Sequence, residues 1–287
     1  MSRNRDRLGL EQETKHADPP IQQTINDTTS DNPFSFVVPT EFVELPSGGI
    51  YYPENHPLYK QEAVEIKQMT AREEDILTSR SLLKNGVAIE RVIQSLLMNK
   101  AIDPNSLLVC DRNAVIIAAR ISGYGNEYTT GVNCPSCEIT QEYTFDLNNA
   151  VVEDGGSGDA KDNGDGTFNT TLPRTGLTVT FRLLCGQDEK NLSNRSQRRK
   201  SRKANTSDRL ITNQLKSIIV SVNSNDTAEA IDYVVNNLPS MDSTHLRRVY
   251  KDTAPNIDLT QHFFCSNCDY EQDMEVPLNA EFFWPDI

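Results

Sequence analysis

The sequence lacks the motifs that most often identify an enzyme. It contains no G-x-x-x-x-G-K-[ST] phosphate loop, no G-x-S-x-G nucleophile elbow and no H-E-x-x-H metalloprotease motif. Histidine is scarce: there are four in 287 residues, and none lies beside a residue that we would expect to act as a nucleophile. These absences predict that the protein is not an enzyme.

Long apolar runs are absent too. A transmembrane helix needs about 20 consecutive apolar residues, and no stretch of the chain approaches that length. The opening segment, MSRNRDRLGLEQETKHADPP, carries charge but no apolar centre, which argues against a secretory signal peptide. We therefore expect no membrane span and a protein that stays in the cytoplasm in which it is made.

Cysteine is uncommon but is arranged in a pattern. Four of the six cysteines form two C-x-x-C pairs 131 residues apart, Cys134 with Cys137 and Cys265 with Cys268. The same offset aligns an acidic residue directly after each pair, a glutamine three residues later, and a Leu-Asn dipeptide at the end of each copy. Each copy therefore predicts a zinc knuckle, in which two strands flank a tight turn that carries two sulfurs.

Two such knuckles together supply the four thiolates of a closed, tetrahedral zinc site. The paired spacing favours one structural Zn²⁺ bound by all four cysteines, in a ribbon-like site that closes around the residues between the pairs. A disulfide is disfavoured because a cytosolic chain keeps its thiols reduced, and strand-like residues follow both pairs where a redox C-x-x-C would open a helix. Unligated thiols remain the other alternative. His262 is disfavoured as a ligand because four cysteines already fill the shell, and Cys110 and Cys185 lie in apolar stretches typical of buried thiols.

Charge of one sign dominates, with a net charge of −13, but it is unevenly spread. Residues 190–209 hold eight Lys or Arg against one Asp, a local net charge of +7. This segment favours a solvated insertion or a contact with a partner protein, whereas nucleic-acid binding is the alternative. No aromatic residue lies among the basic ones, so the segment cannot stack on bases. Nucleic-acid binding is therefore the weaker of the two hypotheses. The candidate partner contacts in it are Arg198, Arg199, Lys200, Arg202 and Lys203.

The pattern of apolar residues predicts an α+β fold of helical segments and short antiparallel strands, together with the two knuckles. Residues 1–33 are polar and predict a flexible N-terminal arm, and residues 34–287 predict a single body. Inserted loops are expected at 153–166 and 186–209. The first is rich in Gly and Asp, but its spacing does not match a calcium-binding loop.

Helices are expected to begin at a Thr70–Glu73 capping box and at 88, with Asp111 capping the next. The cap explains the acidic cluster after Thr70, so we assign it no catalytic or metal role. A hairpin is expected over 167–184, followed by helices over 211–222, 228–238 and 240–253. The final aromatic residues are either an anchor for a partner or a plug in the protein's own core: Phe282, Phe283 and Trp284.

Several segments of the sequence resemble those of one family of phage proteins. The stretches FVELPSGGIYYPENHPL, EIKQMTAREEDILTS and DRNAVIIAARISGYGNEY, the last running into VNCPSC, together with the closing FFWP, resemble the T4-like baseplate hub assembly proteins of contractile-tailed phages. The resemblance covers about 34–150 and 255–287, and MTAREEDIL is its most specific part. It implies a baseplate or tail-assembly component that binds other tail proteins, in the host cytoplasm during assembly and, if retained, in the virion. It implies no catalytic residues.

Overall fold

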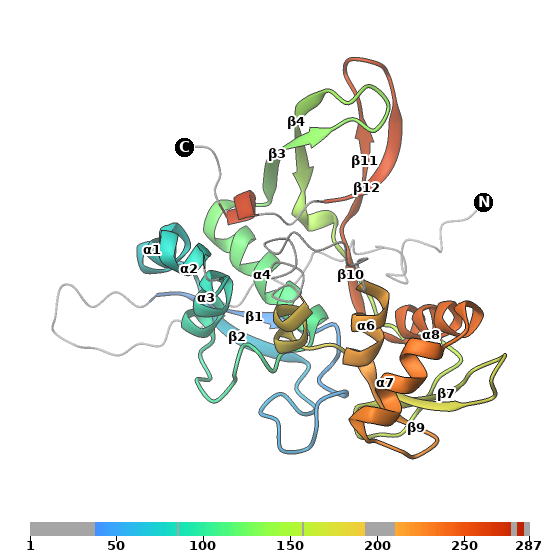
Figure 1. Cartoon of the computed structure of the whole chain (residues 1–287). Helices are drawn as coiled ribbons and strands as arrows, with labels where there is room; N and C mark the ends of the chain where they lie inside the picture. Colours follow the sequence, from blue (N-terminus) through green and yellow to red (C-terminus); the bar gives the residue numbers. More distant parts are fainter. Residues whose placement is uncertain (1–37, 85, 157, 193–209, 277–279, 284–287) are drawn as a thin grey trace, which may run out of the picture.

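The computed structural model describes residues 38–84, 86–156, 158–192, 210–276 and 280–283. The predicted N-terminal arm at 1–33 and residues 193–209 of the predicted loop at 186–209 lie outside these ranges, and residues 186–192 form a helix rather than a loop. The fold is α+β, as predicted, with short antiparallel strands and four clustered cysteines. Figure 1 shows three parts, which we name the central body, the arm and the lobe.

The central body contains a two-stranded antiparallel sheet and four helices. Its elements are β1 (Thr40–Glu44), β2 (Ala63–Lys67), α1 (Ala71–Thr78), α2 (Arg80–Lys84), α3 (Ala88–Leu96) and α4 (Val109–Tyr124). The capping box at the start of α1 forms as predicted, because Glu73 accepts hydrogen bonds from both the backbone N–H and the hydroxyl of Thr70. The helical segment that begins at this box is divided at Ser79 into α1 and α2.

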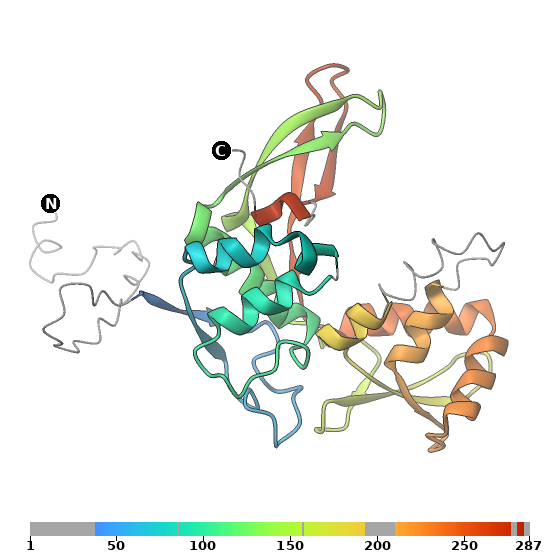
Figure 2. The same ribbon diagram turned by 60° about the vertical axis from the view of Figure 1, so that its left-hand side comes forward.

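The arm consists of two hairpins that stand out from the central body side by side (Figures 1 and 2). One is β3 (Glu127–Asn133) with β4 (Thr140–Asp146), and the other is β11 (Thr260–Phe264) with β12 (Glu271–Glu275). Alternate residues of β3 are buried, as a strand with one inward face requires. At the base of the arm, η1 (Leu147–Asn149) and η2 (Ala280–Phe283) return the chain to the body.

The lobe is a four-stranded antiparallel sheet accompanied by helices. The sheet order is β6 (Lys161–Asp162), β7 (Thr167–Thr171), β8 (Thr178–Arg182) and β9 (Ile219–Val222), and the helices are α6 (Leu210–Ile218), α7 (Ala228–Asn237) and α8 (Ser240–Thr253). Val179 and Phe181 have no exposed surface, which agrees with their predicted inward alternation. A further pair, β5 (Val151–Glu153) with β10 (Asn256–Asp258), joins segments that are about 100 residues apart.

Two local predictions were wrong. The helix expected over 211–222 ends at Ile218, and the chain continues as β9 on the free edge of β8, because Ile219, Val220 and Val222 suit a strand. Asp111 does not cap α4, which begins at Val109, but lies in its first turn with no exposed surface. Its carboxylate accepts hydrogen bonds from the Ser47 and Tyr52 hydroxyls at 2.6 and 2.7 Å, so it fastens the turn after β1 to α4.

Buried polar groups connect elements that are distant in the sequence. Arg120 of α4 is 1% exposed and donates to the carbonyl oxygens of Gly125, Glu127 and Phe282, so it holds the base of the arm and η2 together. Asp242 of α8 has no exposed surface and accepts from the backbone N–H groups of the β7–β8 turn. The buried apolar side chains of all three parts form one continuous core.

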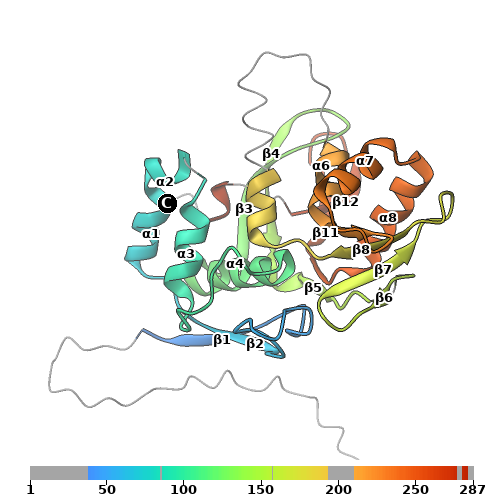
Figure 3. The same cartoon turned by 60° about the horizontal axis from the view of Figure 1, so that its bottom comes forward.

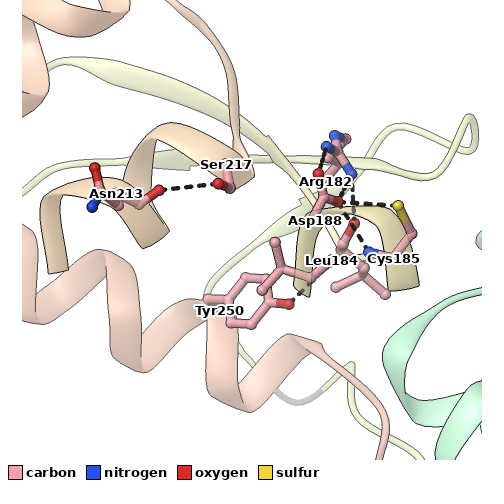
Figure 4. Close-up of polar contacts among 8 residues, drawn as sticks. Arg182, Leu184, Cys185, Asp188, Asn213, Ser217 and Tyr250 are labelled. Carbon is pink, nitrogen blue, oxygen red and sulfur yellow. Dashed lines mark hydrogen bonds and ion pairs between the residues drawn. The ribbon is translucent and has the colours of Figure 1, made fainter. Parts of the chain in front are cut away.

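The segment that leads into the 186–209 region is anchored on the lobe (Figure 4). The Arg182 guanidinium makes two hydrogen bonds to the Asp188 carboxylate, at 2.7 and 2.8 Å. Asp188 also accepts from the backbone N–H of Cys185, and the Leu184 N–H donates to the Tyr250 hydroxyl. The next two residues contact the central body: Glu189 forms an ion pair with Arg112 of α4, and Lys190 forms one with Glu90 of α3 at 2.7 Å. The start of the basic segment is therefore held by both the lobe and the central body.

Candidate metal centre

Each C-x-x-C pair lies in the turn at the tip of one hairpin, and the two turns have the same backbone geometry. The Cys134 N–H donates to the carbonyl of Ile139, and the Glu138 N–H donates to the carbonyl of Cys134, at 3.0 and 2.9 Å. In the second knuckle the matching bonds, from Cys265 to Tyr270 and from Asp269 to Cys265, measure 2.9 and 3.0 Å.

The residue after each cysteine pair has a left-handed backbone, with φ of 59° at Glu138 and 55° at Asp269. This conformation is uncommon outside glycine, so its occurrence at both positions shows that the 131-residue repeat is a repeat of structure.

The four sulfurs lie together. Cys134 Sγ is 3.7 Å from Cys268 Sγ, Cys137 Sγ is 3.8 Å from Cys265 Sγ, and all four atoms lie within 4.8 Å of one another. Thiolates bound to Zn²⁺ at about 2.3 Å in a tetrahedron are separated by about 3.8 Å. The donor set and its spacing therefore fit a four-coordinate metal ion.

The two closest sulfur pairs are related by exchange of the repeats. The 131-residue offset converts the Cys134–Cys268 pair into the Cys265–Cys137 pair. The two knuckles thus face each other with approximate two-fold symmetry, and each contributes one buried sulfur (Cys134, Cys265) and one partly exposed sulfur. A site of this kind leaves no ligand position for a substrate.

Side chains of one hairpin bind the backbone of the other. The Gln141 amide donates to the carbonyl of Phe264 at 2.9 Å and accepts from the Ser266 N–H at 3.0 Å. The Tyr143 hydroxyl donates to the carbonyl of His262, and Gln261 exchanges two hydrogen bonds with the backbone of Asp146. These bonds hold the hairpins in the register that brings the sulfurs together.

Crowding of the thiols affects their protonation. The backbone N–H of Tyr270 lowers the pKa of the Cys268 thiol, but burial and hydrogen bonds with the three other sulfurs raise the pKa overall, to about 12. Deprotonation of all four thiols is unfavourable because it would place four negative charges close together. A bound cation reverses this preference because it stabilises the thiolates.

The other candidate ligands lie apart from this cluster. His262 is on the outer face of β11, where its imidazole contacts Asp273 at 3.3 Å. Cys110 is buried at the start of α4, and burial raises its pKa. Cys185 is half-buried and donates to Asp188 at 3.2 Å. Within the described residues, the only cluster of three or more potential ligands is that of the four predicted cysteines.

The structure describes two of the predicted partner-contact residues. Phe282 and Phe283 are 2% and 3% exposed, and the Phe282 ring packs edge-on against Tyr128 with centroids 5.1 Å apart. They therefore occupy the protein's own core, which was one of the two readings of the sequence. Trp284 and the five basic candidates Arg198, Arg199, Lys200, Arg202 and Lys203 lie outside the described residues.

Sequence reasoning missed the side chains that align the hairpins and join the parts. Gln141 was visible only as a repeated position, and Asp242 and Arg120 gave no signal beyond being polar residues in helical segments.

Within the described part of the chain, no helix combines the length and apolar character needed to cross a bilayer.

Comparison with known protein families gives a match over most of the chain. A model of the family described as T4 bacteriophage base plate protein matches residues 39–284, which is most of the chain. The matched range includes the central body, both hairpins of the arm and the lobe. Neither a curated protein nor a solved structure matches.

Proposed function

Because the chain belongs to the family of T4 bacteriophage base plate proteins, we propose that it is an assembly component of the hub of a contractile-tail baseplate. The family supports a structural role in the baseplate and contacts with other tail proteins. The family match over residues 39–284 is the observation that carries this proposal. The closed cysteine cluster agrees with it, because such a site stabilises a fold and offers no open position for chemistry.

The metal in this proposal is one structural Zn²⁺ held by Cys134, Cys137, Cys265 and Cys268. Zinc fits because the ligands are four thiolates at tetrahedral spacing. When bound, the ion would supply folding free energy that the two short hairpins lack on their own. The role of the protein residues is to aim the sulfurs, through the paired knuckle turns and the Gln141 contacts.

The domain arrangement is also part of the proposal. Residues 1–33, which are separate from the two-hairpin arm, act as a flexible N-terminal segment that becomes ordered when it binds a neighbour. Residues 34–287 act as one body with insertions at 153–166 and 186–209. The basic segment at 190–209 and the C-terminal Trp284 are contact elements for other tail proteins. The protein works in the host cytoplasm during assembly and is a candidate for the finished tail.

Three experiments test the proposal. Infected cells that lack the chain should accumulate incomplete baseplates, and mass spectrometry of purified tails shows whether the chain stays in the finished particle or acts only during assembly. Complete, infectious tails formed without the chain would overturn the hub assignment. Elemental analysis of the purified protein should give about one zinc per chain.

Nucleic-acid binding through 190–209 is the rival function, and only the +7 charge of that segment favours it. Binding driven by phosphate contacts weakens steeply as salt rises. We expect no measurable binding of DNA or RNA at about 50 mM salt, where such contacts are strongest. Tight, salt-sensitive binding would favour the rival.

A further inference from the structure

A groove between α1 and α3 gathers positive charge on a protein whose net charge is −13. It has a volume of about 590 Å³. The helices α1 and α3 lie on the side of the central body away from the lobe helices (Figure 3). Four cationic side chains line it, and they come from β2, α1, α3 and the turn after α3: Lys67, Arg72, Arg91 and Lys100. Among the described residues, no Asp or Glu lines the groove. We call it the α1–α3 groove.

Most of this charge has no partner among the described residues. Lys67 forms an ion pair with Glu73 at 2.8 Å, and the Glu73 side chain has no exposed surface, so its charge is used within the fold. Arg72 and Arg91 are exposed and make no ion pair within the described part of the chain. Burial is the main cause of a lowered pKa of Lys100; the nearby Lys67 and Arg72 lower it further, and Glu73 opposes the shift.

Lys100 has a structural use as well. Its ammonium donates to the carbonyls of Gln94 and Ser95 at 3.1 and 3.0 Å, at the C-terminal end of α3, where a cation is favoured. The two arginines have no comparable structural use. Their guanidinium groups are therefore the donors available to a ligand.

The groove also has apolar walls, formed by Ile76, Leu82 and the 46% exposed Met98. We propose that the α1–α3 groove binds an acidic segment of another tail protein, with carboxylates paired to Arg72 and Arg91 and an apolar side chain seated between them. Guanidinium groups bind carboxylates through paired hydrogen bonds, and methionine adapts to the shape of an apolar partner. This assignment deepens the proposed function and rests on it only for the source of the segment.

Two features favour a protein ligand over nucleic acid. No aromatic residue lines the groove, so bases have nothing to stack on, and a phosphate chain would leave the apolar walls unused. The rest of the protein is acidic except for the basic segment at 190–209. The groove combines its charge with apolar walls, whereas that segment holds a single large apolar residue, Leu192, so a partner segment that is both acidic and apolar is expected to prefer the groove.

The test measures binding of a short synthetic peptide of glutamate and leucine to the full, zinc-loaded chain. We expect R72E/R91E to weaken binding by at least about tenfold, because two attractions become repulsions. The control R248E/K251E makes the same change in charge on the exposed face of α8 and should leave the affinity within about twofold. If R72E/R91E lowers the melting temperature, R72Q/R91Q replaces it and should still weaken binding.

Several results would overturn the assignment. These are equal losses in both charge-reversal variants, undiminished binding of a glutamine and leucine peptide, and tighter binding of inorganic phosphate or an oligonucleotide. The arm of a second copy is another acidic source, because residues 126–148 and 259–276 hold eight Asp or Glu and no Lys or Arg. Self-association lost in R72E/R91E would place that arm in the groove and also overturn the assignment to a different protein. Since the peptide assay uses no tail protein, its failure is distinct from failure of the baseplate role.

Discussion

The arm and the lobe solve the same problem, the burial of enough apolar surface, in different ways. The lobe covers a four-stranded sheet with helices, and Phe168 stacks on Phe181 inside it with ring centroids 5.5 Å apart. The arm has only two two-stranded sheets, which project from the body (Figure 2). Its interior is a single layer of side chains such as Tyr143, Phe145 and Phe263.

The difference shows where a metal is needed. A two-stranded hairpin is at best marginally stable in water, and a region with a small core needs a cross-link or metal. The lobe, with its larger core, has no cluster of ligands in its described residues. Zinc in the arm would therefore substitute for missing layers, and its removal should destabilise the arm far more than the lobe.

The largest effect is expected from removing the metal ligands. C134S/C265S should abolish zinc binding, because each knuckle loses its buried sulfur. Structural zinc contributes about 10–16 kcal/mol in small zinc domains, so the arm should lose protection against hydrogen exchange while the lobe keeps it. C185S is the matched control and should retain one zinc, since Cys185 lies outside the cluster. Unchanged zinc content in the double variant would refute the shared site.

The converse experiment destabilises the core of the lobe and leaves the metal site of the arm unchanged. Phe181 has no exposed surface, so Phe181→Ala should lower the free energy of unfolding by about 3–5 kcal/mol. Chemical denaturation monitored by circular dichroism measures the loss, and zinc content should stay the same. Phe264→Ala, at a 40% exposed position on the arm, should cost no more than about 0.5 kcal/mol. Loss of zinc in F181A would show that the two regions do not fold independently.

A buried carboxylate makes the lobe sensitive to acid. Burial opposes ionisation of Asp242, but hydrogen bonds from Arg174 and Thr175 outweigh it and hold its pKa below the usual value. The stability that it supplies is present above the unfolded pKa of about 3.9 and is lost as pH falls through the lower folded pKa.

Asp242→Asn should cost about 2 kcal/mol at pH 7, because bonds to a charged acceptor are replaced by weaker ones, and should flatten the dependence between about pH 5 and 3. Thermal unfolding in the C134S/C265S background measures this without a contribution from metal. An unchanged acid dependence would exclude Asp242 as its source.

The smallest effect tests alignment of the hairpins. Gln141→Ala removes the bonds to Phe264 and Ser266 and should destabilise the arm by about 1 kcal/mol, seen as faster zinc loss to a chelator. Gln272 occupies the equivalent position in the second repeat, but within the described part of the chain its side chain accepts from the Tyr270 hydroxyl on its own hairpin and makes no bond to the other hairpin. Gln272→Ala should therefore have a smaller effect, and equal effects would contradict the alignment role of Gln141.

Prediction from sequence succeeded where the signal was local or repeated. The capping box, the hairpin after residue 166 and the helices of the lobe follow from short patterns, and the 131-residue repeat identified both knuckles. It failed at Ile219, where a helix-like pattern continues but the edge of β8 binds the chain as a strand. Tertiary contact overrode local preference there.

The amino-acid order alone determined that two knuckles exist and which four sulfurs they present, because a C-x-x-C turn is a property of a few neighbouring residues. Only the tertiary structure decided that the sulfurs meet, that Asp111, Arg120 and Asp242 are buried, and that four cations share one groove. The physical reason is range. Backbone turns follow from neighbouring residues, whereas the partner of a buried charge or a distant thiol depends on how the whole chain packs.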